Sequence, residues 1–333
     1  MRIVVGKEVV RVTEELENSY DVVVAGGGAA GLNGALMLAR SRRSVVVIDA
    51  GQPRNAPAEG VHGLLARDGM PPAELVARGR EEVRRYGGHV VSGEITEAVR
   101  DGDGFSIALA DGRRVRARRL LVTTGLTDEL PDIPGLRERW GHDVVHCPYC
   151  HGWEVRDRAI GVLNTGPMSQ HQVQLFRQLS DDVVFFTHDG PEPTADEAER
   201  MAARGIRVVT GKVTAVEHGS GGITGLRLAD GEVVARDVVA VGTRMVARAG
   251  FLNSLGLPAI DHPAGVGRYI PADATGRTEV PGVWAAGNVT ELTAQVGAAA
   301  AAGAMAGAQI NADLVEEEVR AAVAAGSSAV SGM

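Results

Sequence analysis

Two cysteines in a Cys-x-x-Cys arrangement are the residues of this chain with the clearest chemistry. Cys147 and Cys150 are its only cysteines, and His146 and His151 flank them directly. Two thiols at this spacing can close a small disulfide ring, and a thiol at a helix N-terminus has its pKa lowered from about 8.5 toward about 7. Two lone cysteines in a chain of this size do not form a structural framework, so they indicate a redox pair or half of a metal site.

A zinc site is the alternative use of this segment. His146, Cys147, Cys150 and His151 could supply zinc ligands and make a metal-binding or sensor module. Adjacent ligands within one hexapeptide strain a tetrahedral site, and the chain has no second Cys-x-x-Cys. We therefore expect no metal, and an equimolar zinc content in pure protein would contradict this expectation.

A glycine-rich turn near the N-terminus indicates a dinucleotide site. Gly26-x-Gly28-x-x-Gly31 follows an apolar strand and opens an apolar helix, and Asp49 ends the next strand. The glycines allow close approach to a pyrophosphate, the helix start offers N–H groups, and Asp49 can accept from ribose hydroxyls. The segment after Asp49 either flanks the adenosine or only satisfies a turn. The predicted contacts are Gly26, Gly28, Ala29, Ala30, Gly31, Asp49, Ala50, Gly51, Arg54 and Asn55.

The elements that must hold these residues follow a doubly wound pattern. Residues 21–51 form a buried strand, a glycine turn, a helix and a second buried strand, which starts a parallel sheet. The tetrapeptide Leu-Ala-Asp-Gly occurs at 109–112 and at 228–231, each time in a hairpin that leads into an apolar strand. A strand–turn–helix unit, at 22–40 and at 160–179, precedes each copy. This order favours two α/β domains of one design over a chance repeat.

Length, composition and charge limit the class of protein. The chain has 333 residues and a formal net charge of −8, without a basic stripe, which argues against nucleic acid as a partner. About 150 residues per domain predicts two domains. The most apolar long stretch, 296–310, is too short and too weakly hydrophobic to span a bilayer, and residues 1–20 show no signal peptide. We therefore expect a cytoplasmic protein without a membrane partner, with a frayed end at 326–333.

Two further motifs bear on the cofactor. Residues 282–296, GVWAAGNVTELTAQV, resemble the second FAD-binding signature of flavoproteins with two dinucleotide domains, with Asn288 in place of the usual acid. The amide of Asn288 can still bond a ribityl hydroxyl. Thr123-Thr124-Gly125 resembles the Ala-Thr-Gly motif of the same group. FAD is therefore the expected cofactor, with the added contacts Thr124, Gly125, Gly287, Asn288, Ala294, Gln295 and Val296.

Together these segments resemble the low-molecular-weight thioredoxin reductase family over residues 20–315. The resemblance implies two Rossmann-like dinucleotide-binding domains, an FAD domain split in sequence and an inserted NAD(P)-type domain that carries the Cys-x-x-Cys, and it implies a homodimer. By position, Cys150 would lie near the flavin and Cys147 would be attacked by the substrate thiol. The implied boundaries are 18–133 and 246–318 for the FAD domain, 134–245 for the inserted domain, and 1–17 and 319–333 for extensions.

Two departures from the reductases indicate one branch of that family. His151 stands where the reductases have an acid, and a pKa near about 6.5 suits a proton acceptor at neutral pH. The inserted domain's fingerprint is damaged, because residues 164–169 read Asn-Thr-Gly-Pro-Met-Ser. Asp189 stands where the reductases have arginines for the 2′-phosphate of NADPH, and an acid would repel that phosphate. The chain therefore resembles the gliotoxin and holomycin dithiol oxidases, which share a Cys-Pro-x-Cys-His-Gly core.

Two redox functions follow from this resemblance. In the first, which we expect, the enzyme oxidises a small dithiol to a disulfide through Cys147 and Cys150, and the flavin passes the electrons to O2. His151 or His146 takes up protons. In the second, the enzyme is a thioredoxin-reductase-type disulfide reductase that uses NADPH or NADH, with Asp189 on the ribose.

Several other residues have less defined expectations. His62 either approaches the flavin or substrate or has only a turn or surface role. Aromatic residues at the motif and near the C-terminal strand, Tyr149, Trp153 and Trp284, are expected to serve packing. We expect His171 and Gln172, on the inserted domain's helix, to be solvated.

Overall fold

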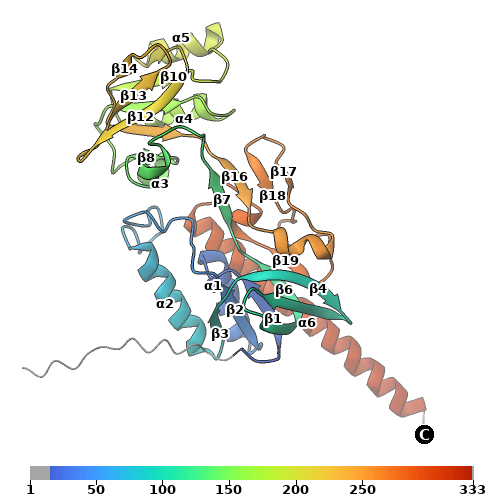
Figure 1. The fold of residues 1–333 in the computed structure, drawn as a ribbon. Coiled ribbons are helices and arrows are strands. Elements are labelled where there is room, and N and C mark those ends of the chain that lie inside the picture. Colours follow the sequence, from blue (N-terminus) through green and yellow to red (C-terminus); the bar gives the residue numbers. More distant parts are fainter. Residues whose placement is uncertain (1–15, 332–333) are drawn as a thin grey trace, which may run out of the picture.

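The computed structural model describes residues 16–331, with side chains for residues 16–327. Figure 1 shows two lobes joined by a pair of strands. The extension predicted at 1–17 lies almost entirely outside the described residues.

The first lobe is built on a seven-stranded sheet in the order β3-β2-β1-β6-β5-β4, with β19 beside β6. The strands β1, β2, β3, β6 and β19 are parallel and mostly buried, which explains their runs of valine and leucine. The two strands predicted after the first Asp-Gly turn form one strand, β6, which pairs with β5 at its start and with β19 at its end. The strand bounds are β1 Ser19–Ala25, β2 Val45–Asp49, β3 His89–Ser92, β4 Ile95–Asp101, β5 Gly104–Leu109, β6 Arg114–Val122 and β19 Val283–Ala285.

Three helices cover this sheet: α1 (Ala29–Arg40), α2 (Pro72–Arg85) and α6 (Val296–Ser331). The small residues of α6 let it approach α1 closely, because a Cβ at Gly303 would overlap the backbone of Ala30. The helix α6 extends beyond the lobe in Figure 1. The frayed end predicted from Gly326 is therefore wrong as far as Ser331, since alanine and valine there continue the helix. Within residues 16–331, none of the helices has the length and apolar character to cross a membrane.

The second lobe has a fully parallel five-stranded sheet in the order β11-β10-β9-β15-β8. A three-stranded antiparallel sheet, β12-β13-β14, packs on it through the second Asp-Gly hairpin. The strand bounds are β8 Val144–Val145, β9 Ile160–Leu163, β10 Val183–Phe186, β11 Arg207–Val209, β12 Val213–Gly219, β13 Gly222–Leu228, β14 Val233–Val234 and β15 Val238–Val241. The helices are α3 Pro148–His151, α4 Ser169–Phe176 and α5 Ala195–Ala203.

Two antiparallel strands, β7 (Leu126–Glu129) and β16 (Arg244–Ala247), carry the chain between the lobes (Figure 1). The fold is α/β with two Rossmann-like sheets, as predicted. The predicted boundary at 245/246 falls inside β16, and the domain boundaries stay predictions. Strands β17 and β18 complete the link sheet, and short 3-10 turns lie between the strands: β17 Ile260–Asp261, β18 Gly267–Tyr269, η1 Arg137–Arg139, η2 Gly250–Leu255 and η3 Gly287–Val289.

Candidate active site

A cavity of about 1820 Å³ between the lobes brings the redox pair and the first glycine turn together. It extends from the end of β1, past the start of α6, to the turn before α4. Of the predicted site residues, Gly31 and Gly287 are not in its lining. Those that line it are Gly26, Gly28, Ala29, Ala30, Asp49, Ala50, Gly51, Arg54, Asn55, Thr124, Gly125, His146, Cys147, Cys150, His151, Asn288, Ala294, Gln295 and Val296.

The first glycine turn forms a cradle that fits a dinucleotide. Gly26 has φ 100°, a conformation that favours glycine, and a Cβ on Gly31 would overlap the Gly26 carbonyl. A Cβ on Gly28 would meet no described atom within 4 Å, so the backbone faces open space at the start of α1. Gly28 is the N-cap residue of α1, and no side chain caps the first amides of this helix. These amides therefore remain available to the phosphates of a ligand.

Asp49 is held at the edge of this cradle. Its Oδ1 accepts from the Gly27 amide at 3.1 Å, and its Oδ2 accepts from Arg80 Nη2 at 2.5 Å. Arg80 lines the cavity from α2, and among the described residues its buried Nε has no hydrogen-bond partner. Sequence reasoning missed Arg80, because only the packing of α2 against α1 and β3 brings it to Asp49.

Asn288 has less freedom than its motif suggested. Its amide nitrogen donates to the carbonyls of Leu292, at 3.2 Å, and Ala294, at 2.8 Å, and so holds the turn before α6. The carbonyl oxygen of the side chain is therefore the atom left for a ligand hydroxyl.

The cysteine pair lies at the start of the short helix α3. Cys147 is its N-cap residue, and the two sulfur atoms are 2.6 Å apart. The hydrogen bond donated by Cys150 lowers the pKa of Cys147 to about 7 against the opposing effect of burial, and the amides of Tyr149 and Cys150 assist. The same bond, together with burial, raises the pKa of Cys150. In the reduced pair, Cys147 is therefore the thiolate and Cys150 the proton donor.

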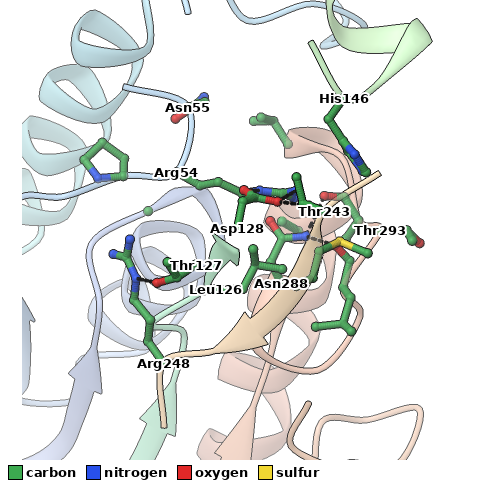
Figure 2. Close-up of a pocket in the computed structure, with 18 of the residues that line it drawn as sticks. Arg54, Asn55, Leu126, Thr127, Asp128, His146, Thr243, Arg248, Asn288 and Thr293 are labelled. Carbon is green, nitrogen blue, oxygen red and sulfur yellow. Dashed lines mark hydrogen bonds and ion pairs between the residues drawn. The ribbon is translucent and has the colours of Figure 1, made fainter. Parts of the chain in front are cut away.

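Both flanking histidines are neutral at neutral pH. Burial lowers the pKa of His146, whose Nδ1 donates to the Val241 carbonyl at 3.0 Å. Burial also lowers the pKa of His151, although the carboxylate of Glu154 opposes this shift. In Figure 2 the His146 ring points into the pocket. Each histidine has an imidazole nitrogen able to accept a proton in the range where thiols react.

An ion pair at the link between the lobes lies beside His146 (Figure 2). Arg54 donates to both carboxylate oxygens of Asp128, at 2.6 and 2.7 Å, and Thr243 Oγ1 donates to the same carboxylate at 2.6 Å. Burial alone would raise the pKa of Asp128, but the Arg54 guanidinium and the Thr243 hydroxyl hold it below its usual range. The structure thus places Arg54, which we expected near an adenosine, against the link strands, where its charge also lowers the pKa of Cys147.

Comparison with known proteins assigns the family. Residues 20–307 match the family model for pyridine nucleotide-disulphide oxidoreductases. The chain belongs to this family. It is 34% identical over 252 residues to thioredoxin reductase tcpT of Claviceps purpurea (strain 20.1), covering 72% of this chain and 78% of that protein. The crystal structure of HlmI matches with a TM-score of 0.88 and 45% identity, over 95% of this chain and 98% of the other.

A second solved structure, an oxidoreductase from Agrobacterium tumefaciens, matches with a TM-score of 0.84 and 36% identity, over 89% of this chain and 99% of that one. This pyridine nucleotide-disulphide oxidoreductase is therefore a thioredoxin reductase-like enzyme of thiol-disulfide chemistry, as the sequence predicted. Within the described part of the chain, no three His, Cys, Asp or Glu side chains gather as a metal site. The zinc alternative thus gains no support.

The second glycine turn of this family member is closed by its own side chains. Ser169 Oγ accepts from the amides of Thr165, at 3.1 Å, and Gly166, at 3.2 Å. Asn164, in place of the first fingerprint glycine, is buried and packs against Gly190, where a Cβ would overlap its amide. Two amides that would face a pyrophosphate in an intact fingerprint are therefore satisfied within the turn.

The acid expected after β10 is present, but its charge is balanced by an ion pair with Lys212. Asp189 is half-exposed, and Lys212 Nζ lies 3.0 Å from its carboxylate. Hydrogen bonding from Lys212 lowers the pKa of Asp189 below its usual range. An ionised Asp189 disfavours a 2′-phosphate at this position.

Four other expectations have different outcomes. Gln172 was expected to be solvated and is instead buried, because it lies on the face of α4 toward α3. Trp284 is buried, as expected, whereas Tyr149 and Trp153 are 67% and 66% exposed, so they do not pack in the core. Tyr149 lines the large cavity, and the Arg156 guanidinium lies over the Trp153 ring, 4.1 Å from its centroid.

His62 lies in the loop after β2 and reaches the redox segment. Its Nε2 is 3.4 Å from Glu154 Oε1, and its Nδ1 is 3.5 Å from Asp68 Oδ1. Through Glu154, the loop of the first lobe therefore contacts the segment that follows the cysteine pair. This position is next to His151, whose pKa His62 helps to lower.

Proposed function

We propose that this enzyme oxidises a small-molecule dithiol to a disulfide, with FAD as its cofactor and O2 as the electron acceptor. The observation that carries the proposal is that the cysteine pair shares one cavity with the intact first turn, whereas the second turn has Asn164 in place of its first glycine and two amides held by Ser169. The second turn lines the same cavity, with less of its backbone left for a nicotinamide dinucleotide. Electrons then enter from a thiol substrate.

The net reaction is R(SH)2 + O2 → RS2 + H2O2. One substrate thiolate attacks Cys147 of the oxidised pair, the Cys147–Cys150 bond breaks, and a mixed disulfide forms. The second substrate thiolate attacks the substrate sulfur of that mixed disulfide and releases Cys147. Because the pKa of Cys147 is lowered to about 7, it is a good leaving thiolate for this step.

The remaining groups of the cavity hold protons and the cofactor. His146 and His151, both neutral, are the proposed acceptors for the two substrate protons. The first glycine turn, Asp49 and the turn at Asn288 would hold the cofactor. When bound there, FAD supplies a two-electron acceptor for the reduced cysteines and a route for those electrons to O2.

A reductase that uses NADH is the second candidate. A cavity of about 520 Å³ remains beside the second turn, and Asp189 in its lining could accept from ribose hydroxyls. The same carboxylate argues against NADPH.

An anaerobic titration of the purified holoenzyme tests both candidates. Its visible flavin absorbance is followed while NADPH, NADH and then dithiothreitol are added. Bleaching by dithiothreitol alone, reversed by air with formation of peroxide, is the expected result. Rapid bleaching by NADH would favour the reductase, and no response to dithiothreitol would eliminate the oxidase.

We also propose a homodimer, supported by an exposed apolar seam on α6. Apolar side chains recur there at alternating spacings of three and four, the pattern of a helix that pairs with another helix. Sedimentation should show a dimer that Val315→Glu with Val319→Glu dissociates, and a monomeric wild type would contradict the proposal. A cytoplasmic location is proposed with it, to be checked by cell fractionation. The seam comprises Ala298, Ala301, Met305, Ala308, Ala312, Val315, Val319 and Ala322.

A further inference from the structure

Gln172 is a buried polar residue directly behind the redox motif. It lies on α4, lines the large cavity and is 7% exposed. Its Nε2 donates to the main-chain carbonyl of His146 at 2.6 Å. Among the described residues, its Oε1 has no hydrogen-bond partner.

The orientation of this amide follows from its neighbour. A carbonyl oxygen only accepts hydrogen bonds, so the atom of Gln172 that faces the His146 carbonyl must be the nitrogen. Its oxygen is then left buried without a donor, which costs folding free energy. A methionine of the same length would avoid this cost. The fold thus gains little net stability from a glutamine here, since the unpaired oxygen offsets the bond to His146.

The bond acts on the residue that precedes Cys147. The main-chain carbonyl of His146 is held by α4 through Gln172, and its ring Nδ1 donates to the carbonyl of Val241 at the end of β15. Two elements of the second lobe thus fix both the main chain and the side chain of His146. Its Nε2 remains for the cavity, and the following peptide leads directly into Cys147.

We propose that Gln172 is a positioning residue of the redox site, which sets the direction of the His146 ring and the place of the Cys147 sulfur above the first turn of α3. The helix α4 then has a role besides nucleotide binding. Ser169 binds the backbone of the turn before this helix, and Gln172 on its inner face holds the redox motif. This inference rests on the thiol-disulfide chemistry of the proposed function. It does not depend on which electron acceptor is used.

The test is alkylation of the reduced holoenzyme by iodoacetamide across the pH range, with the modified cysteine identified by peptide mass. In Gln172→Met, we expect Cys147 to react about three- to tenfold more slowly at pH 7. This factor corresponds to the free energy of one ordinary hydrogen bond. The pH midpoint of the reaction should move upward. The unfolding temperature should change little, because the lost bond to His146 and the removed unpaired oxygen have opposite effects.

Two further variants control this result. Gln178→Met makes the same change at an exposed position just after α4 and should behave as the wild type. Gln172→Leu also removes the donor and adds no charge, so it should slow alkylation as well. Should the methionine variant fail to fold, the leucine variant decides the outcome.

A wild-type rate and pH midpoint in either folded Gln172 variant would overturn the proposal. Slow alkylation accompanied by a lowered unfolding temperature in both variants would also overturn it, in favour of a structural role. Alkylation needs neither O2 nor a nicotinamide, so failure of the oxidase assay in the wild type would leave this comparison intact.

Discussion

The turn at residues 26–31 and the turn at residues 164–169 follow the same kind of parallel strand and lead into the same kind of helix. In the first turn, Gly28 faces open space and the Gly27 amide donates to the Asp49 carboxylate. In the second, Ser169 Oγ accepts from two backbone amides, and Asn164 is packed against Gly190. The helices that follow, α1 and α4, both lack a side-chain cap, so the difference lies in the turns themselves.

This difference shows how little change separates a dinucleotide site from a structural turn. One hydroxyl at the start of α4 holds two amides of the turn before it, while the first amides of the helix remain without a side-chain cap. The helix behind it remains intact, and in this protein it carries Gln172 toward the cysteines. The second lobe, whose glycine turn is bound by its own serine, is thus the lobe that carries the redox motif.

The largest loss of activity is expected from a substitution in the redox motif of the second lobe. Cys147→Ser removes the sulfur that forms the mixed disulfide, so dithiol oxidation should fall by at least about 10³-fold. The flavin content should not change, because the cradle belongs to the first lobe. Peroxide formation from dithiothreitol measures the first quantity, and flavin absorbance per protein the second. Retained activity would mean that Cys147 is not the attacked sulfur.

Two alanine substitutions test the role of the first turn. In Gly31→Ala, the added Cβ overlaps the Gly26 carbonyl, so we expect a loss of flavin and more than about 3 kcal/mol of stability. In Gly166→Ala, at the position that corresponds to Gly28, the added Cβ meets no described atom within 4 Å, and the change should stay within about 0.5 kcal/mol. Flavin content and chemical denaturation measure both. Flavin retained at the wild-type level in Gly31→Ala would contradict the role of the first turn as the cofactor cradle.

The link between the two regions is expected to have an intermediate effect. Asp128→Asn leaves the Arg54 guanidinium without its carboxylate and should cost about 2 kcal/mol at neutral pH. The pKa of Asp128 is lowered in the folded protein, so its contribution is present above the unfolded value of about 3.9 and is lost as the pH falls through the folded value. Denaturation curves of variant and wild type should therefore converge in acid. A gap that persists there would assign the effect to packing.

The smallest effect is expected from opening the second turn. Ser169→Gly removes two hydrogen bonds and should cost about 1–2 kcal/mol, while it frees the amides of Thr165 and Gly166. Slow reduction of the flavin by NADH should appear in this variant, followed by anaerobic absorbance. If NADH has no effect there, Asn164 or Pro167 also obstructs the site, and the comparison must include them.

Local patterns were sufficient for part of this site. The strand–turn–helix around Gly28, the place of Asp49 and the Cys-x-x-Cys at a helix start all depend on residues close in sequence, so spacing predicted them. The missing glycines of the second fingerprint could also be read from the sequence. The binding of Ser169 to two amides could not be predicted, because it depends on the direction of the serine side chain.

Residues brought together by tertiary packing escaped prediction. Arg80 reaches Asp49 only because α2 packs against α1 and β3, and Gln172 reaches His146 only because α4 contacts α3. Arg54 follows Asp49 in sequence, yet it turns to Asp128 at the link. The exposure of Tyr149 and Trp153 likewise depends on tertiary packing.

The pairing of β7 with β16 has a consequence for the modularity of the chain. Leu126 pairs with Ala247, so the segment that carries the whole redox lobe leaves and re-enters its host at adjacent points. Such an antiparallel pair can be joined by a two-residue turn. We therefore expect that a short splice can remove or exchange the lobe and leave the sheet of the host continuous.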